Sequence, residues 1–193
     1  MARSTRWLLS GLGLFLVLRL MGSATPVAPT VPEYNAKAGY LLLFTRYVEW
    51  PPARFAEADA PIIIGVLGAN PFGEVLEKTV SGQRSQDRPV EIRLVGTVEE
   101  AAACHIVFIS RQEARQQPAW LARLRDLPVL TVAETNEALG QGAVINFVTE
   151  PANRGAKLRF DASLPAMQRA GLHISSPMLV SARQVQRTSK EGG

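Results

Sequence analysis

The chain has 193 residues, of which 47% are hydrophobic and 20% charged, a composition typical of one globular domain with an adequate core. Lysine and arginine number 21 against 17 acidic residues, but three arginines fall in the first 24 residues, leaving 18 against 17. This near balance, without aromatic residues interleaved among basic ones, argues against nucleic-acid binding.

The first residues have the pattern of a secretory signal peptide. A positively charged start precedes the apolar run 7–18, and small residues follow. We expect export to the periplasm, with residues 1–24 removed by cleavage after Ala24, or alternatively after Ala28. An uncleaved N-terminal anchor stays open as an alternative, although the run is shorter than the roughly 20 residues that span a membrane.

The rest of the chain predicts one α/β domain over residues 33–187, between a proline-containing flexible leader, 25–32, and a frayed tail, 188–193. Ile62–Leu67 is rich in β-branched residues and predicts a strand buried on both faces. Short apolar strands alternate with helical segments, which indicates parallel pairing with helices on both faces of the sheet. We therefore expect a three-layer sandwich with a mostly parallel sheet.

Before the C-terminal part, the predicted strands are mostly each followed by a helix. In chain order they are a helix over 33–50, the Ile62–Leu67 strand, a helix over 72–80, a polar loop over 81–87, a strand over 89–95, a helix over 98–103 capped by Thr97, a strand over 105–110, a helix over 111–125 divided by Pro118, and a strand over 128–132.

The pattern changes in the C-terminal part of the chain. Two strands, 143–149 and 157–161, flank a turn rich in Pro, Asn and Gly and predict an antiparallel hairpin. Ser163 is expected to cap a helix over 164–170 that Gly171 ends, and a last helix is expected over 176–185.

The turn after Ile62–Leu67 is the candidate ligand site. Asn70 is expected to cap the next helix. The glycines at 65, 68 and 73 match neither a dinucleotide fingerprint nor a P-loop, so nucleotide binding is disfavoured. A small-molecule cleft lined by Gly68, Asn70 and Phe72 remains an alternative, because ligands often bind at such a turn.

Catalytic and metal motifs are missing from the sequence. It has no G-x-S-x-G, H-E-x-x-H or C-x-x-C. A zinc site would need both His105 and His173 together with Glu134 or Asp161, and we regard it as unfavoured. We therefore predict a protein that is not an enzyme, with no metal or other cofactor.

Cys104 is the only cysteine, so it cannot form a disulfide within the chain. A buried, inert thiol is the favoured interpretation, and a reactive or intermolecular thiol is the alternative.

Six stretches, in order and at matching spacings, carry a resemblance. They are 37–51 (KAGYLLLFTRYVEWP), 64–73 (IGVLGANPFG), 104–110 (CHIVFIS), 128–132 (PVLTV), 142–148 (GAVINFV) and 157–185 (KLRFDASLPAMQRAGLHISSPMLVSARQV). Together they resemble the YfiR family of exported bacterial regulators, the DUF4154 domain, over nearly the whole mature chain.

The resemblance implies a periplasmic α/β protein that binds the periplasmic part of an inner-membrane diguanylate cyclase and represses it. Cyclic-di-GMP and biofilm formation would then fall, and an OmpA-like outer-membrane lipoprotein would draw the regulator away. A homodimer is a further expectation. Better-studied members carry two cysteine pairs, whereas here only Cys104 occupies a family cysteine position, so disulfide-based regulation is not expected. A periplasmic small-molecule-binding module is the alternative function.

Three residues are the candidate partner contacts. Trp50 follows the aromatic flank of the first helix and is expected to be exposed, although core filling is the alternative for that flank. Arg159 and Asp161 lie on the predicted edge hairpin, and Asp161 is also a candidate cap for the next helix. Aromatic and arginine side chains dominate interface hot spots, and edge strands invite pairing.

Overall fold

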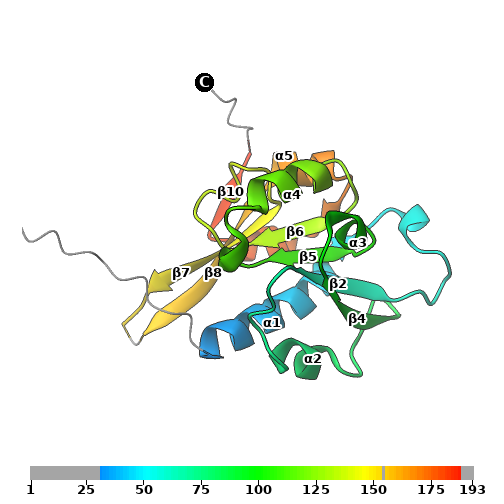
Figure 1. Ribbon diagram of the computed structural model, residues 1–193, viewed down its shortest axis with the longest axis horizontal. Coiled ribbons are helices and arrows are strands. Elements are labelled where there is room, and N and C mark those ends of the chain that lie inside the picture. The colour runs from blue at the N-terminus through cyan, green and yellow to red at the C-terminus, as the bar shows by residue number, and fades with distance from the viewer. Residues whose placement is uncertain (1–30, 154, 188–193) are drawn as a thin grey trace, which may run out of the picture.

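The computed structural model describes residues 31–153 and 155–187 (Figure 1). The predicted signal peptide, most of the leader and all of the predicted tail lie outside the described residues. The helices are α1 (Val31–Tyr47), α2 (Val75–Val80), α3 (Val98–Ala102), α4 (Gln117–Leu124), α5 (Leu164–Arg169) and α6 (Ser176–Ser181), with 3₁₀ turns η1 (Pro52–Arg54) and η2 (Arg111–Glu113). No helix in this part of the chain is both long and apolar enough to cross a membrane.

Ten strands form two sheets in the described residues. They are β1 (Val48–Glu49), β2 (Ile62–Leu67), β3 (Arg84–Ser85), β4 (Arg88–Val95), β5 (Ile106–Ile109), β6 (Leu130–Ala133), β7 (Ile145–Pro151), β8 (Ala156–Ser163), β9 (His173–Ile174) and β10 (Gln184–Gln186). The main sheet has the order β10-β8-β7-β6-β5-β2-β4-β3, and β1 pairs with β9 in a small second sheet. Pairing in the main sheet is parallel except between β7 and β8 and between β3 and β4.

The central strand has the burial that its sequence predicts. All six residues of β2 are buried, and β2 pairs in parallel with β4 on one side and β5 on the other. The chain leaves β2 for β4 and then crosses back to β5, so its winding direction reverses between β2 and β5. In wound α/β domains, ligands bind outside the carboxyl ends of the strands at this position.

Helices cover both faces of the sheet, which confirms the predicted three-layer α/β sandwich (Figure 1). Ile62 and Ile64 of β2 join one core, while Ile63 and Leu67 join the other, because successive strand residues point to opposite faces. Side chains of α1, α2, α5 and α6 close the first core. Those of α3 and α4 close the second.

Several local predictions are confirmed. The side chain of Thr97 accepts a hydrogen bond from the backbone of Glu100, whose own side chain reaches back to form a capping box for α3. Ser163 caps α5 by accepting from the Ala166 N–H, and Gly171 adopts a positive φ of 64° just after that helix. Strands β7 and β8 form the expected antiparallel hairpin.

Near the candidate ligand turn, two boundaries differ from the prediction. The Asn70 side chain accepts from the Phe72 N–H at 3.0 Å and so closes a local turn, while α2 begins only at Val75. The predicted polar loop 81–87 contains the strand β3. Gln86 and Asp87 both have positive φ, 51° and 60°, which lets a two-residue turn join β3 to β4.

The predicted last helix is wrong beyond Ser181. The chain turns there, and β10 runs parallel to β8, with Gln184 opposite Asp161. The Arg183 N–H donates to the Phe160 carbonyl at 2.8 Å, which starts the pairing. Tertiary pairing has overridden the helical pattern of this segment. The first helix likewise differs at both ends, since α1 begins at Val31 and ends at Tyr47, and β1 follows it.

Candidate functional site

The turn after β2, where a ligand was expected, is occupied by a carboxylate of the protein itself. Glu113, in η2 just after β5, accepts a hydrogen bond from the Ala69 N–H at 2.9 Å. Its side chain lies against Gly68, so a Cβ at that position would stand 2.5 Å from the Glu113 Oε1 atom. The anion that such a turn can bind is therefore supplied internally.

Phe72 does not face this turn as the predicted cleft requires. Only 3% of it is exposed, and its ring packs edge-on against Tyr34 and Phe108, with centroids 5.3 Å and 4.9 Å away. Gly68 and Asn70 are exposed, but Glu113 covers the backbone beside Gly68. The expected cleft of Gly68, Asn70 and Phe72 is thus not an open site, because one of its walls is part of the core.

Beside this turn lies a charged network that joins α1 to the ends of β5 and β6. The Glu134 carboxylate, directly after β6, accepts from the Arg111 N–H at 2.8 Å and from the Tyr34 hydroxyl at 3.2 Å. Lys37 forms ion pairs with both Glu134 and Glu33. The Arg111 guanidinium pairs with Glu33 at 2.7 Å and with Glu134 at 3.2 Å.

The centre of this network is buried, while Arg111 at its edge is exposed. The Lys37 residue is 0% exposed, and so is the Glu134 side chain. Burial alone would raise the pKa of Glu134, but the charges of Lys37 and Arg111 and their hydrogen bonds hold it below its ordinary value. Burial, together with the Glu134 charge, raises the pKa of Tyr34. Two cations balance two carboxylates, so the arrangement holds α1 onto the sheet.

Trp50 is buried, and the prediction that it is exposed is wrong. It is 6% exposed, and its indole Nε1–H donates to the His105 carbonyl oxygen at 3.0 Å. Its ring meets the His105 ring edge-on at 5.6 Å, and Phe55 stacks on the same imidazole at 4.7 Å. After β1, the chain turns this side chain into the first core, which agrees with the core-filling alternative.

Arg159 and Asp161 lie two residues apart on β8 and therefore share one face of the sheet. Asp161 is only 5% exposed, and the Arg183 Nε–H donates to its Oδ1 atom at 2.8 Å, while the same guanidinium also reaches Oδ2. Asp161 thus anchors β10, and Ser163 rather than Asp161 caps α5. Trp50 contacts the start of β5 instead, with β6 and β7 between it and β8.

The β7–β8 hairpin extends beyond the rest of the sheet (Figure 1). Within the described residues, β6 pairs with β7 only at Ile145 and Asn146, and β10 pairs with β8 only from Asp161 onward. The outer part of the hairpin is therefore a two-stranded ribbon with free edges. One face packs on α1 through Phe147 and Phe160, and the other carries polar side chains.

Cys104 is fully buried and unpaired, as predicted. Burial raises the pKa of its thiol above the ordinary value, which disfavours the reactive thiolate. Its sulfur lies directly over Gly65, where an added Cβ would stand 2.7 Å from Sγ. The thiol thus occupies space that is available only because residue 65 is a glycine without a side chain.

The two histidines stand in different environments. His105 is buried just before β5, whereas His173 is exposed in β9, opposite Glu49. Across residues 31–153 and 155–187, no three His, Cys, Asp or Glu side chains gather closely enough to hold a metal ion. Glu134 and Asp161, the carboxylates that the disfavoured zinc site would have needed, are each engaged by arginine.

A family model described as YfiR/HmsC-like, the DUF4154 family, matches residues 34–183. The chain belongs to this family. The match starts near the beginning of α1 and ends at Arg183, so it covers both cores, the hairpin and the anchor of β10.

Membership in the YfiR/HmsC-like family indicates the general function of the chain. The YfiR/HmsC-like domain is a regulatory, non-catalytic domain of the periplasm that acts in cyclic-di-GMP signalling, and the family is associated with membrane diguanylate cyclases.

Sequence reasoning missed Lys37, Glu113 and the pairing of Arg183. A signal existed for Lys37, because it lies three residues after Tyr34 and four before Leu41, on a face that was expected to be apolar. Glu113 gave no such signal. Its role depends on β5 lying beside β2, which places η2 over the turn.

Proposed function

We propose that this protein represses an inner-membrane diguanylate cyclase by binding the cyclase's periplasmic part, which lowers cyclic-di-GMP and biofilm formation. Family membership supports the signalling context. We prefer protein binding to small-molecule binding at the switch point between β2 and β5, because Glu113 fills the position at which a wound α/β domain takes a small ligand.

The outer β7–β8 hairpin is the surface best suited to this contact. Its polar face presents Lys157, which is exposed, and Arg159, which is half-buried and has a buried Nε atom without a partner in the described structure. Both edges of the ribbon leave backbone groups free for pairing with a strand of another chain. Arg159 therefore remains a proposed contact, whereas Asp161 supports it by holding β10.

The test uses one charge reversal on the hairpin and one at a distance. Lys157→Glu should weaken binding to the purified periplasmic part of the co-encoded cyclase about tenfold, roughly 1.4 kcal/mol, and should raise cellular cyclic-di-GMP. Lys78→Glu reverses another exposed lysine charge, on α2, and should leave binding unchanged.

The result can contradict the proposal in two ways. Failure of the wild-type protein to bind the cyclase, with unchanged cyclic-di-GMP after deletion, would remove the repressor function. Equal effects of Lys157→Glu and Lys78→Glu would remove the hairpin as the contact.

Release by an OmpA-like outer-membrane lipoprotein and formation of a homodimer belong to the same proposal. Competition binding tests the release, and light scattering tests the homodimer.

A further inference from the structure

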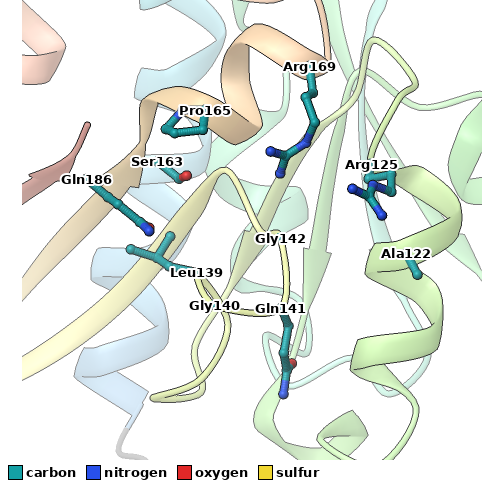
Figure 2. A pocket seen from close by; sticks show the side chains of 10 residues that line it. All are labelled: Ala122, Arg125, Leu139, Gly140, Gln141, Gly142, Ser163, Pro165, Arg169 and Gln186. Atoms are coloured by element: carbon teal, nitrogen blue, oxygen red, sulfur yellow. The ribbon is translucent and has the colours of Figure 1, made fainter. Parts of the chain in front are cut away.

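A hollow of about 350 Å³ opens between the end of α4, the end of α5 and the loop before β7 (Figure 2). Arg125, directly after α4, and Arg169 from α5 flank it from two sides, and no acidic residue lines it. In the described residues, Arg169 forms no ion pair, and Arg125 reaches only its exposed neighbour Asp126 at 3.8 Å. Two arginines facing one space without a carboxylate favour an anionic group there.

A second hollow of about 670 Å³ adjoins the first. The two share Leu139, Gly140, Gln141 and Gln186 in their walls. The second is lined by amide side chains, among them Asn146, by the Glu137 carboxylate, and by Asp161 together with its ion-pair partner Arg183. Together the hollows form one trench with a cationic end and a polar end, in which Arg183 and Asp161 balance each other's charge.

Asn146 places a hydrogen-bond acceptor without a partner in the wall of the second hollow. It is 5% exposed, and its Oδ1 atom has no hydrogen-bond partner in the described structure. A buried amide oxygen without a partner is unfavourable, and a donor entering the hollow would relieve it. Such a side chain in the wall of an open space indicates a ligand or solvent position.

The sheet places further polar groups beside Asn146. Asn146 lies opposite Asp161, which lies opposite Gln184, so the three side chains form a row across β7, β8 and β10. Ala133 of β6, opposite Asn146, belongs to the core beneath α3 and α4. Beside Asn146, the loop 134–144 forms the wall of the second hollow through Leu139, Gly140 and Gln141. The side chains of Asn146, Asp161 and Gln184 therefore also line this hollow.

We propose that this trench binds an anionic sugar, a small saccharide that carries a phosphate or carboxylate group. The two arginines take the anionic group, since guanidinium donors match both oxyanions. The Glu137 carboxylate and the Asn146 amide oxygen accept hydrogen bonds from the sugar hydroxyls, while Asp161 stays paired with Arg183. The site lies away from the closed switch point and would give the regulator a direct input from periplasmic solutes.

Thermal unfolding with a panel of probes at equal concentration tests the ligand class. Glucose 6-phosphate or glucuronate should raise the melting temperature by at least about 2 °C, because a ligand stabilises the state that binds it. Glucose and inorganic phosphate should each give a smaller rise, since each engages one end. No rise with either anionic sugar, or an equal rise with inorganic phosphate alone, would overturn the proposal.

Variants at each end separate binding from folding. Asn146→Leu removes the unpaired oxygen with little change in size, so the ligand-free protein should melt at the same or a higher temperature while the sugar-dependent rise is lost. Where Asn146→Leu lowers the melting temperature, the exposed Gln184→Ala replaces it. An unchanged sugar-dependent rise in the variant used would contradict the proposal.

The arginine end has a matched control on the same helix. Arg125→Gln combined with Arg169→Gln should weaken affinity for the better anionic sugar at least about tenfold and remove the preference over glucose. Arg123→Gln, on α4 but outside the trench, should change neither. Equal affinities in the double variant and the control would contradict the proposal, whatever the outcome for cyclase binding.

Discussion

At the scale of single residues, His105 is held in a neutral form. Its Nδ1 atom accepts a hydrogen bond from the Ile63 N–H at 3.1 Å, so the ring proton lies on Nε2, a buried nitrogen without a partner in the described structure. Burial lowers the pKa of His105 to about 4, and the nearby charges of Arg54, Arg88 and Arg93 add to the effect. Protonation of Nδ1 would remove this acceptor and break its hydrogen bond with the Ile63 N–H.

The folded protein should therefore lose stability in weak acid. The unfolded chain, with an ordinary histidine pKa of about 6.5, binds more protons than the folded chain between pH 6.5 and 4. The contribution is fully present above that range and is lost as the pH falls through it, by up to roughly 3 kcal/mol. Urea unfolding between pH 7 and 4 measures this loss.

The control for the histidine prediction is the second histidine. His105→Gln should flatten the pH dependence of the unfolding free energy between pH 6.5 and 4. His173→Gln removes an exposed histidine and should retain the wild-type slope. A wild-type slope in His105→Gln would show that other groups cause the acid sensitivity.

The network around Glu134 should be sensitive to loss of one partner. Lys37→Met leaves a carboxylate buried with less compensation, so it should lower the free energy of unfolding by about 3–5 kcal/mol. The double variant Lys37→Met with Glu134→Gln removes the surplus charge and should recover part of that loss. Urea unfolding checks both, and a loss below about 1 kcal/mol in the single variant would contradict the argument.

At the scale of the element, α3 depends on its capping box because it is only one turn and a half long. Thr97→Ala removes an acceptor for the Glu100 N–H and should lower the free energy of unfolding by about 1 kcal/mol. Glu99→Ala changes an exposed neighbour in the same turn and should lower the free energy of unfolding less than Thr97→Ala does. Chemical denaturation compares the two, and equal losses would show that the cap is not responsible.

Elements whose signal is local could be predicted from the sequence. The strand Ile62–Leu67, the Thr97 cap and the hairpin of β7 and β8 depend on neighbouring residues and were found in place. β10 could not be predicted, because Gln184–Gln186 becomes a strand only through its pairing with β8. The same holds for Trp50, since the direction of its side chain depends on the path that β1 takes against β9.

The site was less predictable than the fold for a related reason. Glu113 and Gly68 meet because β5 lies beside β2, although 45 positions separate the two residues in the sequence. Residue types and spacing indicate a turn that binds anions, but they do not indicate which carboxylate fills it. The prediction of a ligand cleft therefore failed where tertiary pairing decides.

At the scale of the whole molecule, the last strand completes the sheet. Truncation after Ala182 removes β10 and the guanidinium that pairs with buried Asp161, so the free energy of unfolding should fall by about 3 kcal/mol or more. Truncation after Arg187 removes only the predicted tail 188–193 and should leave the melting temperature unchanged. Calorimetry of both proteins checks the prediction, and similar melting of the two would contradict it.

The position of β10 at the end of the chain also constrains the order of folding. Asp161 meets its cation only when the final residues have become available, more than twenty positions after it was itself synthesised. Until Arg183 is available, Asp161 is an unpaired carboxylate and β8 has an open strand edge. The main sheet is therefore complete only once β10, from the C-terminal part of the domain, has paired with β8.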